Sequence, residues 1–283
     1  MNEAVFHYKV GGRAGGNRPG AHAGRTGGAG NEFLAHARLF DHPDPRRLDL
    51  RASLRAGGEE WLVRLHRQRA AIALYAVVDL SASMACGVPR KLDIAAAFVE
   101  AMGKSAFQTG DAAGLCAFDG SARTDLYRPA HHGRQIGPLL GELVRQARPA
   151  AMPGCGIASA LQPLVGKQAL VFLLSDFHWP LAQTAAALDL LPNAWVVPVV
   201  LWDAREIMPP AANAFVRLRD AESGDLRALW LTPRLRRQWQ DGVAQRRAAL
   251  DAVFATRNLR PLYLSGGFDA AAVSHYFIEG NGA

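Results

Sequence analysis

The feature that most constrains this 283-residue chain is an apolar run that ends abruptly in an acidic residue. Residues 75–84 read Tyr-Ala-Val-Val-Asp-Leu-Ser-Ala-Ser-Met, so Asp79 ends the run and hydroxyls follow at Ser81 and Ser83. Short continuous apolar runs are typical of strands that are buried on both faces of a parallel sheet. Ligands of open parallel sheets gather beyond the carboxyl ends of the strands. We therefore expect one carboxylate and two hydroxyl oxygens at a ligand-binding edge.

Other apolar runs alternate with helical patterns along the chain. Gln168–Asp176 is the strongest strand candidate after Ile72–Asp79, and it also ends in an acid. This alternation predicts the α/β class, with a doubly wound, mostly parallel sheet and helices on both faces. The other expected strands are Gly114–Phe118, a short antiparallel edge strand at Ala122–Tyr127, Trp195–Trp202, Phe215–Leu218, Leu226–Leu231 and Arg260–Leu264. The expected helices are Lys91–Phe107, Gly133–Ala147, Ile157–Leu164, Leu181–Leu190, one from about Pro233 to Thr256, and a last helix that ends at Phe277.

Changes in composition divide the chain into four expected parts. Residues 1–32 are expected to form a flexible arm rich in Gly and Arg, whose glycines follow no strand and match no dinucleotide fingerprint. Residues 33–70 form an ordered N-terminal segment, and residues 71–203 contain the α/β domain. Residues 204–283 are expected to be a C-terminal addition that packs on this domain.

The net charge of +7 does not by itself indicate a nucleic-acid partner. Arg supplies nearly all of the positive charge, and abundant Ala accompanies it, which is typical of GC-rich coding sequence. A solvated basic face is the favoured interpretation of the arginines near the C-terminus, and no zinc-finger or RNA-recognition signature is present. We therefore expect no nucleic-acid partner. These clustered residues are Arg234, Arg236, Arg237, Arg246 and Arg247.

The sequence predicts a cytoplasmic protein. The N-terminus has neither a basic start nor an apolar signal core, and no stretch approaches the length of a membrane span. Cys86, Cys116 and Cys155 are irregularly spaced and provide no disulfide framework.

The two acidic strand ends predict a cation site. In a mostly parallel sheet we expect Asp79, Ser81 and Ser83 to lie within a few ångströms of Asp176. Carboxylate and hydroxyl oxygens suit Mg²⁺ or Mn²⁺, and a site with few charged ligands leaves the ion able to accept a carboxylate from another protein. The alternative is that the serines only cap a helix, because Ser favours that position.

The pattern Asp79-x-Ser81-x-Ser83 resembles the metal-ion-dependent adhesion site (MIDAS) of von Willebrand factor A (vWA) domains. The resemblance implies that Asp176 completes the site, often through a water. It also implies a loop Thr in a Gly-Thr-x-Leu-x-x-Ala-Leu segment, and Cys155 stands at that position here. Because a thiol is a poor ligand for Mg²⁺, the resemblance implies a degenerate site in which metal binding is weak or absent.

A second resemblance covers most of the chain. Pro45–Arg55 reads Pro-Arg-Arg-Leu-Asp-Leu-Arg-Ala-Ser-Leu-Arg, which resembles a stretch of the bacterial DUF58 family, with Leu50 where that family has Trp. Gly110–Leu115, Ser175–Phe177 and Asp220–Gly224 also match this family in order and spacing. The resemblance implies a vWA-like cytoplasmic protein that is not an enzyme. It would act as an adaptor with a MoxR-type AAA+ ATPase on a client protein. Similarity to short relatives of the MxaS type implies methanol dehydrogenase as a client.

Two other functions remain open from the sequence. One is a vestigial scaffold that binds no metal and acts through its Gly/Arg-rich arm. The other is a phosphatase-like, metal-dependent hydrolase, which would need a second Asp at position 81, where this chain has Ser81. Gly103-Lys104-Ser105 is not the end of a phosphate-binding loop, because Phe98 replaces the required first glycine.

Overall fold

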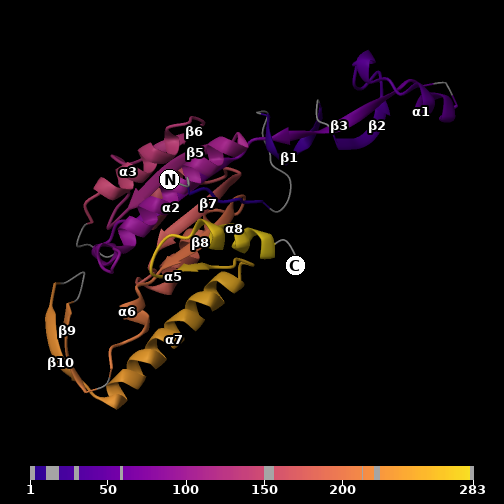
Figure 1. Cartoon of the computed structure of the whole chain (residues 1–283). Helices are drawn as coiled ribbons and strands as arrows, with labels where there is room; N and C mark the ends of the chain where they lie inside the picture. The colour runs from indigo at the N-terminus through magenta and orange to yellow at the C-terminus, as the bar shows by residue number, and fades with distance from the viewer. Residues whose placement is uncertain are drawn as a thin grey trace. The chain divides into compact units, whose positions relative to one another are not determined.

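The computed structural model describes residues 4–10, 19–28, 32–57, 60–149, 156–211, 213–219 and 224–280. The chain forms two compact units, whose helices and strands are labelled in Figure 1. Unit 1 comprises residues 1–9 and 73–283, and unit 2 comprises residues 10–72. The chain enters unit 1 for the second time at Ala73, and the N-terminal residues are divided between the two units.

The core of unit 1, in its described part, is a six-stranded sheet in the order β11-β8-β7-β4-β5-β6. The central strands β4 and β7 are buried along nearly their whole length, as expected for continuous apolar runs. Only β6 is antiparallel to its neighbour. The predicted doubly wound, mostly parallel sheet is therefore confirmed. The strands are β4 (Ala73–Asp79), β5 (Ala112–Phe118), β6 (Arg128–His131), β7 (Ala169–Ser175), β8 (Trp195–Leu201) and β11 (Leu262–Leu264).

Helices cover both faces of this sheet. One face carries α2 (Lys91–Thr109), α3 (Ile136–Gln146) and α8 (Ala270–Glu279), and the other carries α4 (Ile157–Leu161), α5 (Leu181–Asp189) and α7 (Pro233–Ala255). Shorter elements are two 3₁₀ helices, η2 (Ala82–Ala85) and η3 (Gln162–Leu164), the helix α6 (Ala204–Ile207), and the hairpin of β9 (Ala214–Arg219) and β10 (Leu226–Leu231).

The predicted edge strand at Ala122–Tyr127 is wrong in position. Ala122 forms only an isolated bridge with Phe118, and the edge strand is β6, which pairs with β5 through residues 128 and 131. β6 is short, half-exposed and contains Pro129, so it lacks the apolar run that identifies a buried strand. Pro is tolerated there because an edge strand leaves some backbone N–H groups unpaired.

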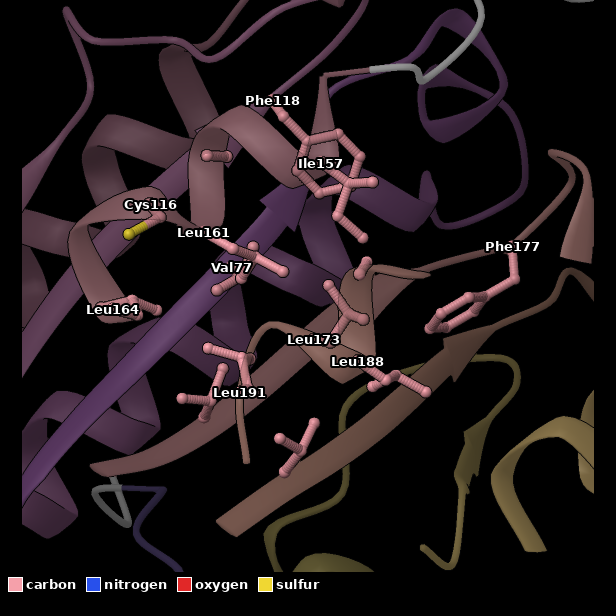
Figure 2. Close-up of a cluster of buried hydrophobic side chains, with 14 of the residues drawn as sticks. Val77, Cys116, Phe118, Ile157, Leu161, Leu164, Leu173, Phe177, Leu188 and Leu191 are labelled. Carbon is pink, nitrogen blue, oxygen red and sulfur yellow. The ribbon is translucent and has the colours of Figure 1, made fainter. Parts of the chain in front are cut away.

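The main hydrophobic cluster lies between the sheet and the face that carries α4, α5 and α7. Figure 2 shows Val77 and Leu173 of the central strands together with Ile157, Phe177 and Leu188. Because successive strand residues point to opposite faces, the neighbouring Phe172 belongs to the other face of the sheet, where it contacts Phe98 of α2.

The N-terminal residues complete the core on that other face. The ring centroid of Phe6 lies 5.4 Å from that of Phe98 and 6.0 Å from that of Phe172. The Phe6 N–H donates a hydrogen bond to the Ser105 hydroxyl at 2.9 Å, and the Tyr8 hydroxyl donates to Asp111. The expected flexible arm over residues 1–32 therefore does not describe this segment, because its alternating apolar residues are buried in unit 1.

Unit 2 contains an antiparallel sheet in the order β1-β3-β2. Asp49 caps α1, and its carboxylate accepts a hydrogen bond from the Arg64 side chain at 2.7 Å. The Ser53 hydroxyl donates to the Asp49 carbonyl and accepts from the Leu62 N–H, both at 2.8 Å. The stretch that resembles DUF58 thus fixes α1 to β3. The elements are β1 (Pro19–Gly28), β2 (Glu32–Arg38), η1 (Pro45–Arg47), α1 (Leu50–Arg55) and β3 (Leu62–Ala70).

Candidate functional site

The two predicted acids lie at neighbouring strand ends. Asp79 is the last residue of β4, and Asp176 follows the last residue of β7. These strands are parallel neighbours, and Val78 pairs with Leu174. The chain passes from β4 to β5 on one side and later to β7 on the other, so β4 lies at the topological switch point of the sheet.

Hydrogen bonds join the four predicted site residues. The Asp79 carboxylate accepts from the Ser81 N–H at 2.8 Å and from the Ser175 hydroxyl at 2.8 Å. The Ser81 and Ser83 hydroxyl oxygens are 3.1 Å apart, and the Ser83 side chain is hydrogen-bonded to Asp176. The expectation that Asp79, Ser81, Ser83 and Asp176 lie together is confirmed.

The two carboxylates differ in their electrostatic surroundings. Burial, together with the negative charge of Asp176, raises the pKa of Asp79 to about 7. Burial alone would also raise the pKa of Asp176, but the charges of Lys91 and His178 and the hydrogen bonds from Lys91 and Ser83 together outweigh burial and lower this pKa overall. At neutral pH the site therefore contains one ionised carboxylate and one that carries a proton about half of the time.

Lys91 is a member of this site that sequence reasoning missed. It is the first residue of α2, and only 1% of its side chain is exposed. Its ammonium donates to Asp176 at 2.8 Å and forms an ion pair with Glu206 at 2.6 Å. Burial by itself lowers the pKa of Lys91, but the two acids raise it overall. The sequence pattern of the helix could not indicate that Lys91 belongs to the site, because both of its acidic partners are distant in the sequence.

Neighbouring side chains hold the loops around Asp176. The Trp202 indole N–H donates to the Asp176 carbonyl at 2.9 Å. Asp203 caps α6 by accepting from the Arg205 N–H, and it also accepts from the Val88 N–H at 2.9 Å. A pocket of about 490 Å³ lies beside these loops, with a mostly apolar lining. It is lined by His178, Trp202, Glu206, Ile207, Leu218, Trp239, Gly242, Val243 and Arg246.

Several of the clustered arginines of α7 are used within the molecule. Arg246 donates to the backbone carbonyls of Phe177 and Trp179, and the Arg247 guanidinium lies 4.3 Å from the ring centroid of Tyr263. These contacts favour a structural role over a surface that follows phosphate groups.

The oxygen atoms of the site have the chemistry of Mg²⁺ or Mn²⁺ ligands, but their present arrangement does not fit a divalent ion. One Asp176 oxygen is already bound by the Lys91 ammonium, and both Asp79 oxygens accept hydrogen bonds. In the part of the chain that the structure describes, no group of three or more His, Cys, Asp or Glu side chains could hold a metal. Cys155, the residue at the expected Thr position, lies outside the described residues.

Comparisons with known proteins give one family and two structural neighbours. A model for proteins of unknown function, DUF58, matches residues 38–249. The crystal structure of an aerotolerance-related membrane protein from Bacteroides fragilis NCTC 9343, with multiple mutations to serines, is 12% identical, and the alignment covers 74% of this chain and 98% of that chain with a TM-score of 0.42. A von Willebrand factor type A structure from Catenulispora acidiphila is 16% identical. That alignment covers 76% of this chain and 43% of the other, with a TM-score of 0.38. No curated protein matches the sequence. Among the described residues, no helix is both long enough and apolar enough to cross a membrane.

Proposed function

This chain belongs to the DUF58 family of proteins of unknown function, and we propose that it is a protein-interaction module that acts as a non-enzymatic adaptor. The partner that we propose is a MoxR-type AAA+ ATPase, with which the adaptor would mature or assemble a client protein such as methanol dehydrogenase. The family resemblance suggests these partners, and a surface of unit 2 supports the interaction role.

The observation that carries the proposal is a set of exposed apolar side chains on unit 2. Phe40 is 95% exposed and Leu54 is 71% exposed, and Phe33, Leu50 and Trp61 are each more than half exposed. Such a concentration on one small unit is unusual for a surface that faces only water, and it is typical of protein interfaces.

The charges of unit 2 indicate the chemistry of the partner. In α1, Leu50 and Leu54 are one helical turn apart, and the exposed Arg51 and Arg55 form a neighbouring stripe at the same spacing. An apolar stripe beside a basic stripe is complementary to an acidic, amphipathic segment of a partner. We therefore propose that the ATPase or its client presents such a segment.

The strand-edge site is the second contact that we propose. Ser83 is half-buried at this edge, and we propose that a partner group entering the loop contacts this residue. Mg²⁺ or Mn²⁺ could strengthen the contact, as the MIDAS resemblance implies. A metal-free scaffold is the competing version, and it is favoured by Lys91, which already supplies a positive charge to Asp176.

A pulldown of the MoxR-type ATPase from the native host tests the proposal. Phe40→Asp and Leu54→Asp should each reduce recovery about tenfold or more, because apolar anchors dominate interface energies. Leu139→Asp is the matched control, because Leu139 is an exposed apolar residue of unit 1 and should leave recovery unchanged. Equal recovery with all three variants would contradict an interface on unit 2.

The contribution of the strand-edge site needs separate variants. Asp79→Ala should abolish recovery of the ATPase if this site takes part, while the protein remains folded. The experiment is run with Mg²⁺, with Mn²⁺ and with a chelator, which separates the metal-assisted version from the metal-free one. Normal recovery by folded Asp79→Ala protein would mean that the site is vestigial and that another surface makes the contact.

A further inference from the structure

We infer that the Lys91 ammonium is the resident cation of the strand-edge site, and that it excludes divalent metal ions from this site. The inference deepens the proposed function, because it says what the second contact can offer a partner. It rests on the geometry of the site and does not depend on which partner binds.

The burial of Lys91 is the first observation. Lysine is almost never fully buried unless its charge is paired, because removing an ammonium group from water is costly. Here the side chain is 1% exposed, and its ammonium contacts Asp176 at 2.8 Å and Glu206 at 2.6 Å. Asp176 is itself 1% exposed. The chain therefore pairs a buried cation with the acid that the MIDAS pattern assigns to a metal.

The position of the ammonium explains why a divalent ion is excluded. An ion bound to Asp176 would lie within a few ångströms of Lys91, and two positive charges at that separation repel strongly in a buried site. Relief would require Lys91 to move away from Asp176. The enclosed Lys91 ammonium also pairs with Glu206, so such a movement would give up one of two ion pairs at a buried position.

The acid on the neighbouring strand is also occupied. The two Asp79 oxygens accept hydrogen bonds from the Ser81 N–H and the Ser175 hydroxyl. A metal would have to compete with these bonds as well as with Lys91. The set of oxygen atoms that resembles a MIDAS thus works here as an internal hydrogen-bond network in which Lys91 pairs with Asp176.

This arrangement limits the chemistry of the proposed contact. A metal-bearing site would coordinate a carboxylate of the partner. With Lys91 in place, the site instead offers the half-buried Ser83, whose hydroxyl oxygen lies 3.1 Å from that of the buried Ser81. The group that fits is a polar, hydrogen-bonding group of the partner, and its binding should be insensitive to chelators.

Mn²⁺ titration by calorimetry and by electron paramagnetic resonance tests the inference. The wild-type protein should bind no Mn²⁺ that depends on Asp79 and Asp176. Lys91→Met replaces the ammonium with a neutral side chain of similar length, and it should raise Mn²⁺ affinity by about 10- to 100-fold. Adding Asp176→Asn to that variant should abolish the gain. Lys91→Arg keeps the charge and should behave as the wild type.

Two results would overturn the inference. One is wild-type Mn²⁺ binding that is lost in Asp79→Asn, which remains measurable even if Lys91→Met does not fold. The other is a folded Lys91→Met variant, verified by circular dichroism, whose Mn²⁺ affinity equals that of the wild type. Neither result would affect the adaptor proposal, which the unit 2 variants test. A failed pulldown would likewise leave the Mn²⁺ titrations interpretable.

Discussion

Asp79→Asn should remove the pH dependence of stability that Asp79 contributes at the strand-edge site. Burial and the charge of Asp176 raise the pKa of Asp79 from 3.8 to about 7. This difference corresponds to about 4 kcal/mol in the free energy of unfolding. Because the folded-state pKa is the higher one, the folded protein binds the proton more tightly than the unfolded chain. The contribution is complete below about pH 4 and is lost as the pH rises through 7.

The asparagine variant has no proton to lose at this position. Its amide oxygen can accept from the Ser81 N–H, while its NH₂ group faces the Ser175 hydroxyl, which must turn to accept. We expect this rearrangement to cost about 1–2 kcal/mol. The wild type has already lost about 2 kcal/mol of this contribution at pH 5, so the variant should be about as stable as the wild type at pH 5 and about 2–3 kcal/mol more stable at pH 8.

Urea denaturation between pH 5 and pH 8, with a chelator present, measures this growing difference in stability. The quantity compared is the difference in unfolding free energy between variant and wild type at each pH. Asp189→Asn is the matched control, because Asp189 is exposed and its bond to Arg257 lowers its pKa. Its difference from the wild type should be constant over this range. Parallel stability curves for the wild type and Asp79→Asn would show that Asp79 stays ionised and would refute the reasoning.

Three further predictions concern the packing and the metal. Phe6→Ala should lower the free energy of unfolding by about 3 kcal/mol in urea denaturation, because it removes a buried ring; a loss below about 1 kcal/mol would mean that this segment is not part of the core. Gly137→Ala should cost about 2–3 kcal/mol, because the added methyl would lie 2.5–2.8 Å from backbone atoms of α2 and would overpack the contact between the two helices. Its control, Gly242→Ala in α7, has open space and should gain up to about 1 kcal/mol; equal thermal stability of the two variants would contradict close packing of α2 and α3. Cys155→Thr should not create Mn²⁺ binding in calorimetry while Lys91 is present. A gain of binding would show that residue 155, and not Lys91, prevents the wild type from binding the metal.

The sheet and the four site residues were predictable because they depend on local patterns. Continuous apolar runs identify β4 and β7, and the acids at their ends are placed together by the parallel topology alone. Lys91 could not be predicted, since its partners Asp176 and Glu206 are set by tertiary packing, and a lysine at the start of a helix is usually exposed. The N-terminal segment was missed for the same reason: Phe6 and Tyr8 stand beside a long glycine-rich stretch, and their contacts come from residues about 100 positions away.

The division of the N-terminal residues between the two units has a mechanical consequence. Residues 4–9 are anchored in the core of unit 1, and the chain returns to unit 1 at Ala73. Unit 2 is thus inserted between two segments of unit 1, and the chain connects it covalently to unit 1 at both ends. If a partner pulls on unit 2, the load divides between the Phe6 anchor and strand β4, whose last residue is Asp79. A single proteolytic cut in either connection would leave unit 2 attached to unit 1 through the other connection. A domain attached at only one end would be released by such a cut.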